Sequence, residues 1–394
     1  MVSFRNISAL AVLCAAMLPG LASDATAAGG CSAAAAETVA YEQLAGVPLN
    51  STSLDLYAPA AGCVAGGGPA PVVIWVHGGG YHNGDKANQV ADKVRLFNDL
   101  GYVFISVNYR LTVAGDPASA HYPDHYRDVA AAVAWTRAKI ASRGGDPRRI
   151  ALFGHSAGAD IVSNVAVNPA WLGERGLGLD DLRCAGPLDT EGFDKVASSD
   201  DGEDLHWLDS LGNNPNYKTE TSANYLIRPR TGIAPVITVF RGSAQRQQIE
   251  NAFAQRLRDA GVQTTLIDAR SLSHNEVNTK IGAAGDTVMT GPIVDFLADC
   301  FAPRPPARPA LRRRPAAVVH LGPRRRRAKV TFAFSSSTDG ARYQCRLGGA
   351  AFKSCRSPRS YTVGRGRHVF SVRAVSVEGA GPVKTLRFRV ESRR

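Results

Sequence analysis

The sequence contains few cysteines, and none in a pattern suited to binding a metal. Seven cysteines occur among 394 residues, and neither a Cys-x-x-Cys pair nor a histidine cluster has metal-ligand spacing. We therefore predict no metal and no other cofactor.

Long apolar runs are also scarce. The one notable run, residues 7–18, follows Arg5 and precedes Ala25-Thr26-Ala27. A basic start, a short apolar core and an Ala-x-Ala site are typical of a secretory signal peptide, and the run is short for a membrane span. We predict a signal peptide at 1–27 and a secreted or cell-surface-associated protein.

Cys14 would leave with the signal peptide. The remaining six cysteines are an even number, which indicates disulfides in an exported chain. The sequence alone leaves the pairing open; the pairs we predict are Cys31–Cys63, Cys184–Cys300 and Cys345–Cys355.

Acidic residues are nearly missing from the last quarter of the chain. From residue 301 onward, 23 Lys and Arg stand against 3 Asp and Glu, a net charge of +20, so residues 1–300 carry −8 of the total of +12. Such a region predicts an anionic partner, a cell-wall polymer or a membrane surface. A solvated basic linker is the plainer alternative. Export and the absence of a recognisable nucleic-acid-binding fold disfavour nucleic acid.

Between residues 28 and 301, apolar runs alternate with helical patterns, after two early strands at 37–44 and 53–57. This alternation predicts an α/β fold with a mostly parallel sheet covered on both faces. The expected strands are 72–76, 103–107, 150–153, 182–188, 235–240 and 263–267, and the expected helices are 87–100, 125–142, 157–167, 245–260 and 288–299.

The rest of the chain has two different patterns. Residues 302–328 are dense in Pro and Arg, which predicts an extended linker. From residue 329 to 394 the apolar period becomes two, as in Val330, Phe332 and Phe334. Short runs of this kind predict a small all-β sandwich.

Two motifs indicate acyl-transfer chemistry. Gly154-His155-Ser156-Ala157-Gly158 lies between an apolar run and a helical pattern, where a strained turn would expose the serine hydroxyl. His77-Gly78-Gly79-Gly80-Tyr81 follows another strand-like run, and its bare amides could face a developing oxyanion. Ser156 is the predicted nucleophile.

A serine nucleophile needs a base, and His274 is the candidate. It follows the last predicted strand and precedes the closing helix. We expect His155 to serve in packing and His77 to shape the glycine loop.

Residues 36–300 resemble an α/β-hydrolase of the esterase/lipase type, in particular the hormone-sensitive-lipase-like and feruloyl-esterase-like carboxylesterases. The resemblance implies Ser156 as nucleophile, His274 as base and an oxyanion hole from the N–H groups of Gly78, Gly79 and Ala157. The motifs that carry it are His77–Tyr81, Gly84-Asp85-Lys86, Asn108-Tyr109-Arg110-Leu111, Gly145-Asp146-Pro147 and Gly154–Gly158.

The C-terminal region resembles bacterial immunoglobulin-like or fibronectin-type modules. The resemblance rests on Phe332-x-Phe334, Tyr343-x-Cys345 and the run from Gly366 to Ala374. Such modules imply spacing or surface attachment.

A serine nucleophile and its histidine base normally work with a third residue, an acid that orients the histidine. The chain departs from the family at this acid. The matching stretch, 241–246, has no carboxylate, and Gln245 stands where an Asp is expected. Asp189, Asp268 and Glu276 could substitute. Asp189 is favoured because the order Ser156…Asp189…His274 suits the fold.

These features together predict a secreted serine carboxylesterase that hydrolyses small carboxylic esters through an acyl-enzyme. The alternative is a non-catalytic or weakly active surface protein that uses the scaffold for binding, and the missing Asp near Gln245 is the feature in its favour.

Overall fold

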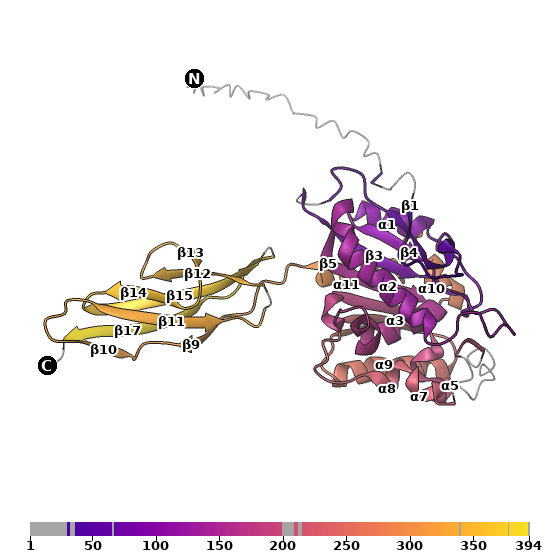
Figure 1. Cartoon of the computed structure of the whole chain (residues 1–394). Coiled ribbons are helices and arrows are strands. Elements are labelled where there is room, and N and C mark those ends of the chain that lie inside the picture. The colour runs from indigo at the N-terminus through magenta and orange to yellow at the C-terminus, as the bar shows by residue number, and fades with distance from the viewer. Residues whose placement is uncertain are drawn as a thin grey trace, which may run out of the picture. The chain divides into compact units, whose positions relative to one another are not determined.

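The computed structural model describes residues 30–31, 36–64, 67–198, 209–211, 215–338, 340–376 and 378–392, so the predicted signal peptide at 1–27 lies outside the described residues. The chain divides into two compact units, Met1–Phe296 and Leu297–Arg394 (Figure 1). In the part of the chain that is described, no helix combines the length and the apolar character needed to cross a membrane.

The first unit is built on one eight-stranded sheet with the strand order β1-β2-β4-β3-β5-β6-β7-β8. β1 pairs with β2, and β2 with β4, in antiparallel fashion, whereas all pairs from β4 to β8 are parallel. The strands are β1 (Glu37–Ala40), β2 (Ser53–Tyr57), β3 (Ala70–Val76), β4 (Val103–Val107), β5 (Gly145–His155), β6 (Cys184–Leu188), β7 (Val236–Phe240) and β8 (Thr264–Asp268).

Most helices lie between these strands along the chain, and α10 and α11 follow β8. The α-helices are α1 (Ala91–Asp99), α2 (Asp124–Lys139), α3 (Ala157–Val167), α4 (Pro169–Gly173), α5 (Lys195–Ser198), α7 (Tyr217–Glu220), α8 (Ala223–Leu226), α9 (Ala244–Asp259), α10 (His274–Thr279) and α11 (Thr290–Phe301). Short 3₁₀ helices are η1 (Leu49–Thr52), η3 (Ile140–Arg143), η4 (Leu179–Asp181) and η5 (Glu191–Asp194).

The central strands are apolar on both faces, and helices cover both. Every residue of β3, β4 and β6 is buried. On one face, Phe296 of α11 contacts Phe153 of β5. The next residue back, Leu152, points to the other face and joins the core cluster that includes α2 and α3. The prediction of a mostly parallel sheet covered on both faces is confirmed.

The six predicted disulfide cysteines are all disulfide-bonded. The pairs Cys31–Cys63 and Cys345–Cys355 form as predicted. Cys184 and Cys300 are both deeply buried.

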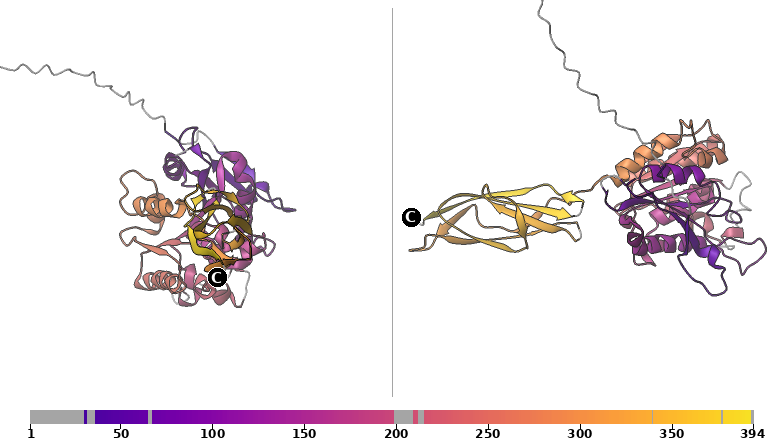
Figure 2. Two further views of the ribbon diagram at one scale, coloured as in Figure 1. Left: turned by 90° about the vertical axis from the view of Figure 1, so that its left-hand side faces the viewer. Right: turned by 90° about the horizontal axis from the view of Figure 1, so that it is seen from above.

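The second unit is an all-β module with two sheets. One sheet has the order β10-β17-β15-β12-β13, with β16 beside β15, and the other has the order β14-β11-β9. Their strands, orange to yellow in Figure 2, are β9 (Ala310–Arg313), β10 (Val318–Leu321), β11 (Ala328–Ser335), β12 (Arg342–Leu347), β13 (Lys353–Cys355), β14 (Arg359–Val363), β15 (Gly366–Ser376), β16 (Gly379–Ala380) and β17 (Lys384–Ser392). Phe332 and Phe370 stack in its core with ring centroids 3.9 Å apart.

The linker prediction for 302–328 needs a correction. Two strands of the second unit, β9 and β10, lie inside that range. Leu321 is buried in the core of the module, and Leu311 and Val319 pack against it. These apolar side chains therefore draw a Pro- and Arg-rich segment into the sheets. The division of the chain at 296/297 also falls before the predicted boundary at 301/302.

Candidate active site

Ser156 occupies a strained turn between β5 and α3. Its φ of 59° and ψ of −124° lie in a region that L-residues rarely adopt. A Cβ atom at Gly154 would lie 2.5 Å from the Gly158 carbonyl oxygen, and one at Gly158 would lie 2.3 Å from the Val76 oxygen. Glycine is therefore required on both sides of the turn, as the motif predicts.

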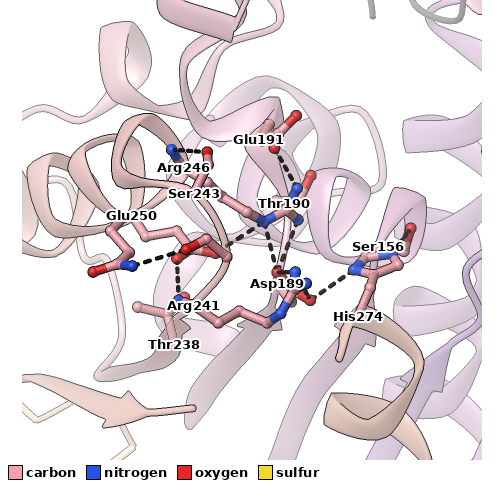
Figure 3. A network of polar contacts seen from close by, with 12 residues as sticks. Ser156, Asp189, Thr190, Glu191, Thr238, Arg241, Ser243, Arg246, Glu250 and His274 are labelled. Carbon is pink, nitrogen blue, oxygen red and sulfur yellow. Dashed lines mark hydrogen bonds and ion pairs between the residues drawn. The ribbon is translucent and has the colours of Figure 1, made fainter. Parts of the chain in front are cut away.

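Three side chains from separate elements meet in one hydrogen-bonded chain (Figure 3). The Ser156 hydroxyl donates to Nε2 of His274 over 2.9 Å, and Nδ1–H of His274 donates to Oδ2 of Asp189 over 2.6 Å. Asp189 directly follows β6 and is fully buried, whereas His274 is the first residue of α10. This is the geometry of a nucleophile, a base and an orienting acid.

The other candidate acids lie elsewhere. Asp268 is exposed and pairs with Arg270 at 2.6 Å. Glu276 closes a capping box with Ser273 at the start of α10. Gln245 donates through Nε2 to the backbone oxygen of Ala197, 2.6 Å away. Of the candidate acids considered in the sequence, the structure brings only Asp189 into contact with the His274 ring.

Two arginines that sequence reasoning did not assign hold the Asp189 carboxylate. Nη1 of Arg241 lies 3.0 Å from Oδ2, and Nε and Nη2 of Arg246 lie 2.9 and 2.8 Å from Oδ1. Burial alone would raise the pKa of Asp189. The hydrogen bond from His274 and the charges of Arg246 and Arg241 outweigh burial and hold that pKa well below its ordinary value.

Two further carboxyl groups surround the arginines. Nη1 of Arg246 pairs with Glu191 at 2.5 Å, and the backbone N–H of Arg241 donates to Oε2 of Glu250 over 2.8 Å. Burial and the nearby charge of Asp189 raise the pKa of Glu250 to about 9. Nε of Arg246 also lies 3.6 Å from Oε1 of Glu250. The arginines stand in the stretch where the family acid was expected, but Asp189 lies 57 positions before Arg246, so the local sequence does not indicate their partner.

The predicted oxyanion-hole residues flank the serine. Among the described residues, the backbone N–H groups of Gly78, Gly79 and Ala157 have no acceptor in the protein. A Cβ atom at Gly78 would lie only 2.9 Å from Cβ of Ser156, so the glycine loop directly adjoins Ser156. Free amides beside a serine hydroxyl are suited to stabilising a tetrahedral oxyanion.

The remaining histidines of the two motifs have the packing roles expected of them. Nδ1–H of His77 donates to the Gly78 oxygen over 2.7 Å, and its ring stacks on Tyr109 with centroids 4.6 Å apart. The ring of His155 packs against His274, and its Nε2–H donates to the His274 backbone oxygen over 2.8 Å.

The only group with metal-ligand proximity in the described residues is formed by His155, Asp189 and His274, whose ligand-type atoms lie within 4.8 Å of one another. Burial and the neighbouring His274 lower the pKa of His155 to about 3, so its ring is neutral. Its Nε2 carries the proton donated to a carbonyl oxygen, and Nδ1 of His274 carries the proton donated to Asp189. Hydrogen bonding therefore already uses one ring nitrogen of each of these two histidines.

Two clefts open on either side of the serine. One has a volume of about 600 Å³ and a neutral polar lining that includes Asn83, Gln89 and Asn275. The other, of about 510 Å³, contains Thr190, Glu191 and Arg246. Ser156 and His274 line both clefts, so both clefts adjoin the serine hydroxyl.

The sheet order, the strained serine turn and the hydrogen-bonded side chains define an α/β-hydrolase. Solved structures agree with this fold. Esterase B from Lactobacillus rhamnosis has a TM-score of 0.54 at 18% identity, covering 68% of this chain and 88% of that one. Esterase 2 of Thermogutta terrifontis has a TM-score of 0.53 at 21% identity, covering 68% and 93%.

Sequence comparison finds a similarity to one protein family over part of the chain. Residues 50–173 match the family model described as the Carboxylesterase family. Carboxylesterase 3B of Mus musculus is 34% identical over 121 residues, which are 30% of this chain and 20% of that protein. A probable carboxylic ester hydrolase, LipM of Mycobacterium tuberculosis, is 37% identical over 102 residues, or 26% and 22%. The match thus spans about a fifth of each relative's length.

Proposed function

We propose that this protein is a serine carboxylesterase that hydrolyses small carboxylic esters through an acyl-enzyme intermediate. The observation that carries the proposal is the continuous hydrogen-bonded chain from Ser156 through His274 to Asp189, on a strained turn beside unpaired backbone amides. The similarity of residues 50–173 to carboxylesterases supports the same reaction.

The mechanism follows from these positions. His274 removes the proton from Ser156 as Oγ attacks the ester carbonyl carbon, and the N–H groups of Gly78, Gly79 and Ala157 stabilise the oxyanion. When the tetrahedral intermediate collapses, the protonated His274 gives its proton to the leaving alcohol. Water, deprotonated by His274, then attacks the acyl carbonyl carbon. When this second tetrahedral intermediate collapses, the bond to Ser156 Oγ breaks, protonated His274 gives its proton to that oxygen, and the carboxylic acid is released.

The substrate class follows from the two clefts. Each has a volume within the range of pockets that hold a small-molecule ligand, and both adjoin Ser156. We therefore assign small-molecule esters whose acyl and alcohol parts each occupy one cleft. A series of p-nitrophenyl esters of increasing acyl length should show falling kcat/KM once the acyl chain outgrows its cleft.

Replacing the proposed nucleophile, Ser156, tests the proposal. Ser156→Ala should abolish hydrolysis of p-nitrophenyl acetate and labelling by a fluorophosphonate probe, because only an activated serine reacts with that probe. Ser142→Ala, which changes an exposed serine in η3, is the matched control and should retain both reactions. Labelling that survives in Ser156→Ala would refute the assignment.

The alternative of a non-catalytic binding protein rested on the missing acid near Gln245. Asp189 supplies a carboxylate to His274 from the adjacent strand, which removes that argument. Wild-type protein that is folded but is not labelled by fluorophosphonate would restore the alternative.

We further propose that the protein is secreted and that its second unit attaches to an anionic cell-wall polymer. Disulfide-bonded cysteines support an oxidising, extracellular compartment. N-terminal sequencing of the mature protein should find a start near residue 28. A start at Met1 on protein taken from the medium would contradict cleavage.

The attachment surface we assign is the outer face of the six-stranded sheet. Arg367 on β15 lies directly opposite Arg389 on β17, and Arg387 is two residues away on the same face. The intervening Phe388 and Val390 are buried in the core, so the three arginines project outward, and all three are exposed. Like charges directly opposite each other are unfavourable in a sheet. A bound polyanion would remove that cost.

A hollow of about 690 Å³ lies at one end of this face and includes His320, Arg365, Arg367 and Arg389 in its lining. Glu391, which pairs with Arg389 at 2.7 Å, is the one described carboxylate in that lining. A salt-titrated pull-down on purified cell wall should show binding that weakens steeply with salt and is lost in Arg367→Gln/Arg387→Gln/Arg389→Gln. Equal or tighter retention on DNA or on anionic vesicles would overturn the choice of a wall polymer.

A further inference from the structure

The two arginines on the triad acid occupy the place where a family acid would be expected. Arg241 follows β7, and Arg246 lies in the first turns of α9, yet both side chains turn toward Asp189 at the end of the neighbouring β6 (Figure 3). The side chains of Arg241 and Arg246 are each only 13% exposed, and that of Asp189 is fully buried. These contacts are therefore shielded from solvent.

We propose that Arg241 and Arg246 are positioning residues that lock the triad carboxylate and extend to lower pH the range in which His274 acts as a base. This inference rests on the proposed function and deepens it. The arginines act through Asp189 and are not assigned any contact with the ester.

The positioning role follows from the hydrogen bonds. Arg241 approaches both carboxylate oxygens of Asp189 through Nη1, at 3.1 and 3.0 Å, and Arg246 approaches Oδ1 through two nitrogens. Arg241 is itself held by a bond from its Nε to the backbone oxygen of Leu272, two residues before His274. Planar guanidinium groups fix a carboxylate in orientation as well as in position. One network therefore sets both partners of the His274–Asp189 bond.

The effect on pH follows from the charges that face the acid. Arg241 and Arg246 carry two positive charges, and Asp189 and Glu191 carry two negative charges. Burial raises the pKa of Glu250, although Nε of Arg246 lies 3.6 Å from its Oε1. Burial lowers the pKa of His155, and the charge of Lys93 acts in the same direction.

Beside Asp189 alone, an imidazolium at His274 would face a full carboxylate charge. Arg241 and Arg246 place two positive charges against the same carboxylate oxygens, at 2.8 to 3.1 Å, and so offset part of that compensation. The arginines thus weaken the stabilisation of protonated His274 by Asp189. As a result, His274 should stay unprotonated, and able to act as base, at lower pH than it would beside Asp189 alone.

The experiment removes one positive charge at a time. Arg246→Gln and Arg241→Gln should each move the acid limb of the kcat/KM profile to higher pH by roughly one unit, because Asp189 then stabilises the protonated imidazole more strongly. Arg270→Gln is the matched control. Arg270 is exposed, lies four residues before His274 and pairs with Asp268, so its removal should leave the limb in place.

Two further variants separate charge from structural damage. Arg246→Lys keeps the charge but loses the planar fork, so kcat should fall while the acid limb stays where it is in the wild type. Arg246→Gln/Glu191→Gln removes one charge of each sign, so its limb should return to within about 0.3 units of the wild type. Limbs of Arg246→Gln and Arg241→Gln that coincide with the wild type would overturn the proposal.

A second readout does not depend on catalysis. In the Ser156→Ala background, the downfield proton resonance of His274 Nδ1–H can be titrated by NMR with and without Arg246→Gln. The midpoint should rise by roughly one pH unit in the arginine variant. An unchanged midpoint refutes the inference even if the wild-type protein hydrolyses no ester. A shifted midpoint without ester turnover would count against the proposed function alone.

Discussion

Oδ2 of Asp189 lies 2.6 Å from Nδ1 of His274, although the two residues are 85 positions apart in the chain. Asp189 follows β6, one strand before the position after β7 that the family resemblance implies for the acid. β6 and β7 are parallel neighbours, so their carboxyl ends meet at the same edge of the sheet. A carboxylate at either end can therefore reach the same imidazole.

The first prediction concerns this acid. Asp189→Asn should lower kcat by roughly 10³- to 10⁴-fold, because a neutral amide no longer favours the tautomer in which Nε2 of His274 accepts a proton. Steady-state kinetics on p-nitrophenyl acetate measures the loss. Gln245→Ala, whose side chain bonds to Ala197 instead, should change kcat less than tenfold. A greater loss in Gln245→Ala than in Asp189→Asn would transfer the acid's role to the loop after β7.

The second prediction concerns the glycine loop. Gly78→Ala would place Cβ 2.9 Å from Cβ of Ser156 and 3.0 Å from the His155 oxygen, so the loop must move away from the nucleophile. Displacing one oxyanion donor should reduce kcat by about 10²- to 10³-fold with little change in KM. Gly68→Ala, where a Cβ meets nothing within 4 Å, serves as control. Full activity in Gly78→Ala would show that the Gly78 N–H is not one of the oxyanion donors.

The sequence predicted the parts of the site that depend on local chain geometry. Ser156 and the glycine loop sit in motifs whose glycines permit a tight turn and close backbone approach, and that requirement fixes the residue types at short spacing. His274 was predicted from its place after the last strand. Asp189 was favoured, but Asp268 and Glu276 stayed open, because the choice depends on which strand ends lie beside His274 in three dimensions.

The arginines on Asp189 and the strands β9 and β10 were beyond sequence reasoning for the same reason. Arg246 bonds to a residue 57 positions earlier, so nothing in its own neighbourhood marks its role. In the segment 302–328, the many Arg and Pro residues make the short apolar pattern around Leu321 hard to recognise as a strand. The core partners of that pattern, such as Val330 and Phe388, come from later in the chain.

A third prediction tests a buried ion pair beneath the serine. Nζ of Lys195 lies 2.7 Å from Oδ1 of Asp160, and both side chains are fully buried. Asp160 also accepts hydrogen bonds from the hydroxyls of Tyr81 and Tyr126. Lys195→Met leaves the carboxylate without its counter-charge and should lower the free energy of unfolding by about 3–5 kcal/mol.

Urea unfolding of wild type and variant measures this difference. Arg127→Met is the control because Arg127 forms an exposed pair with Glu174 at 2.8 Å. Such a pair contributes only about 0–1 kcal/mol. Equal losses for Lys195→Met and Arg127→Met would show that the buried pair adds nothing beyond a surface ion pair.

The last prediction concerns Lys93, a buried residue of α1 whose partners Trp75, Gln89 and Asn278 line one of the two clefts at Ser156. Its Nζ donates to the backbone oxygens of Gln89 and Asn278 at 3.0 and 2.9 Å and lies 4.6 Å from the centre of the Trp75 ring. Burial lowers the pKa of Lys93 from 10.5 to about 7. Between these two values the unfolded chain holds a proton on Lys93 that the folded chain has lost.

The sign of the effect follows from this proton difference. Where the unfolded state binds more protons, stability rises with pH, here by up to about 1.4 kcal/mol per pH unit above pH 7. Lys93→Met removes this contribution, so the wild type should gain stability relative to the variant as the pH rises from about 7 to 9. Urea unfolding at several pH values measures the change, and Lys139→Met, at an exposed position, is the control. A wild-type-minus-variant difference that stays constant across this range would mean that Lys93 remains charged inside the fold.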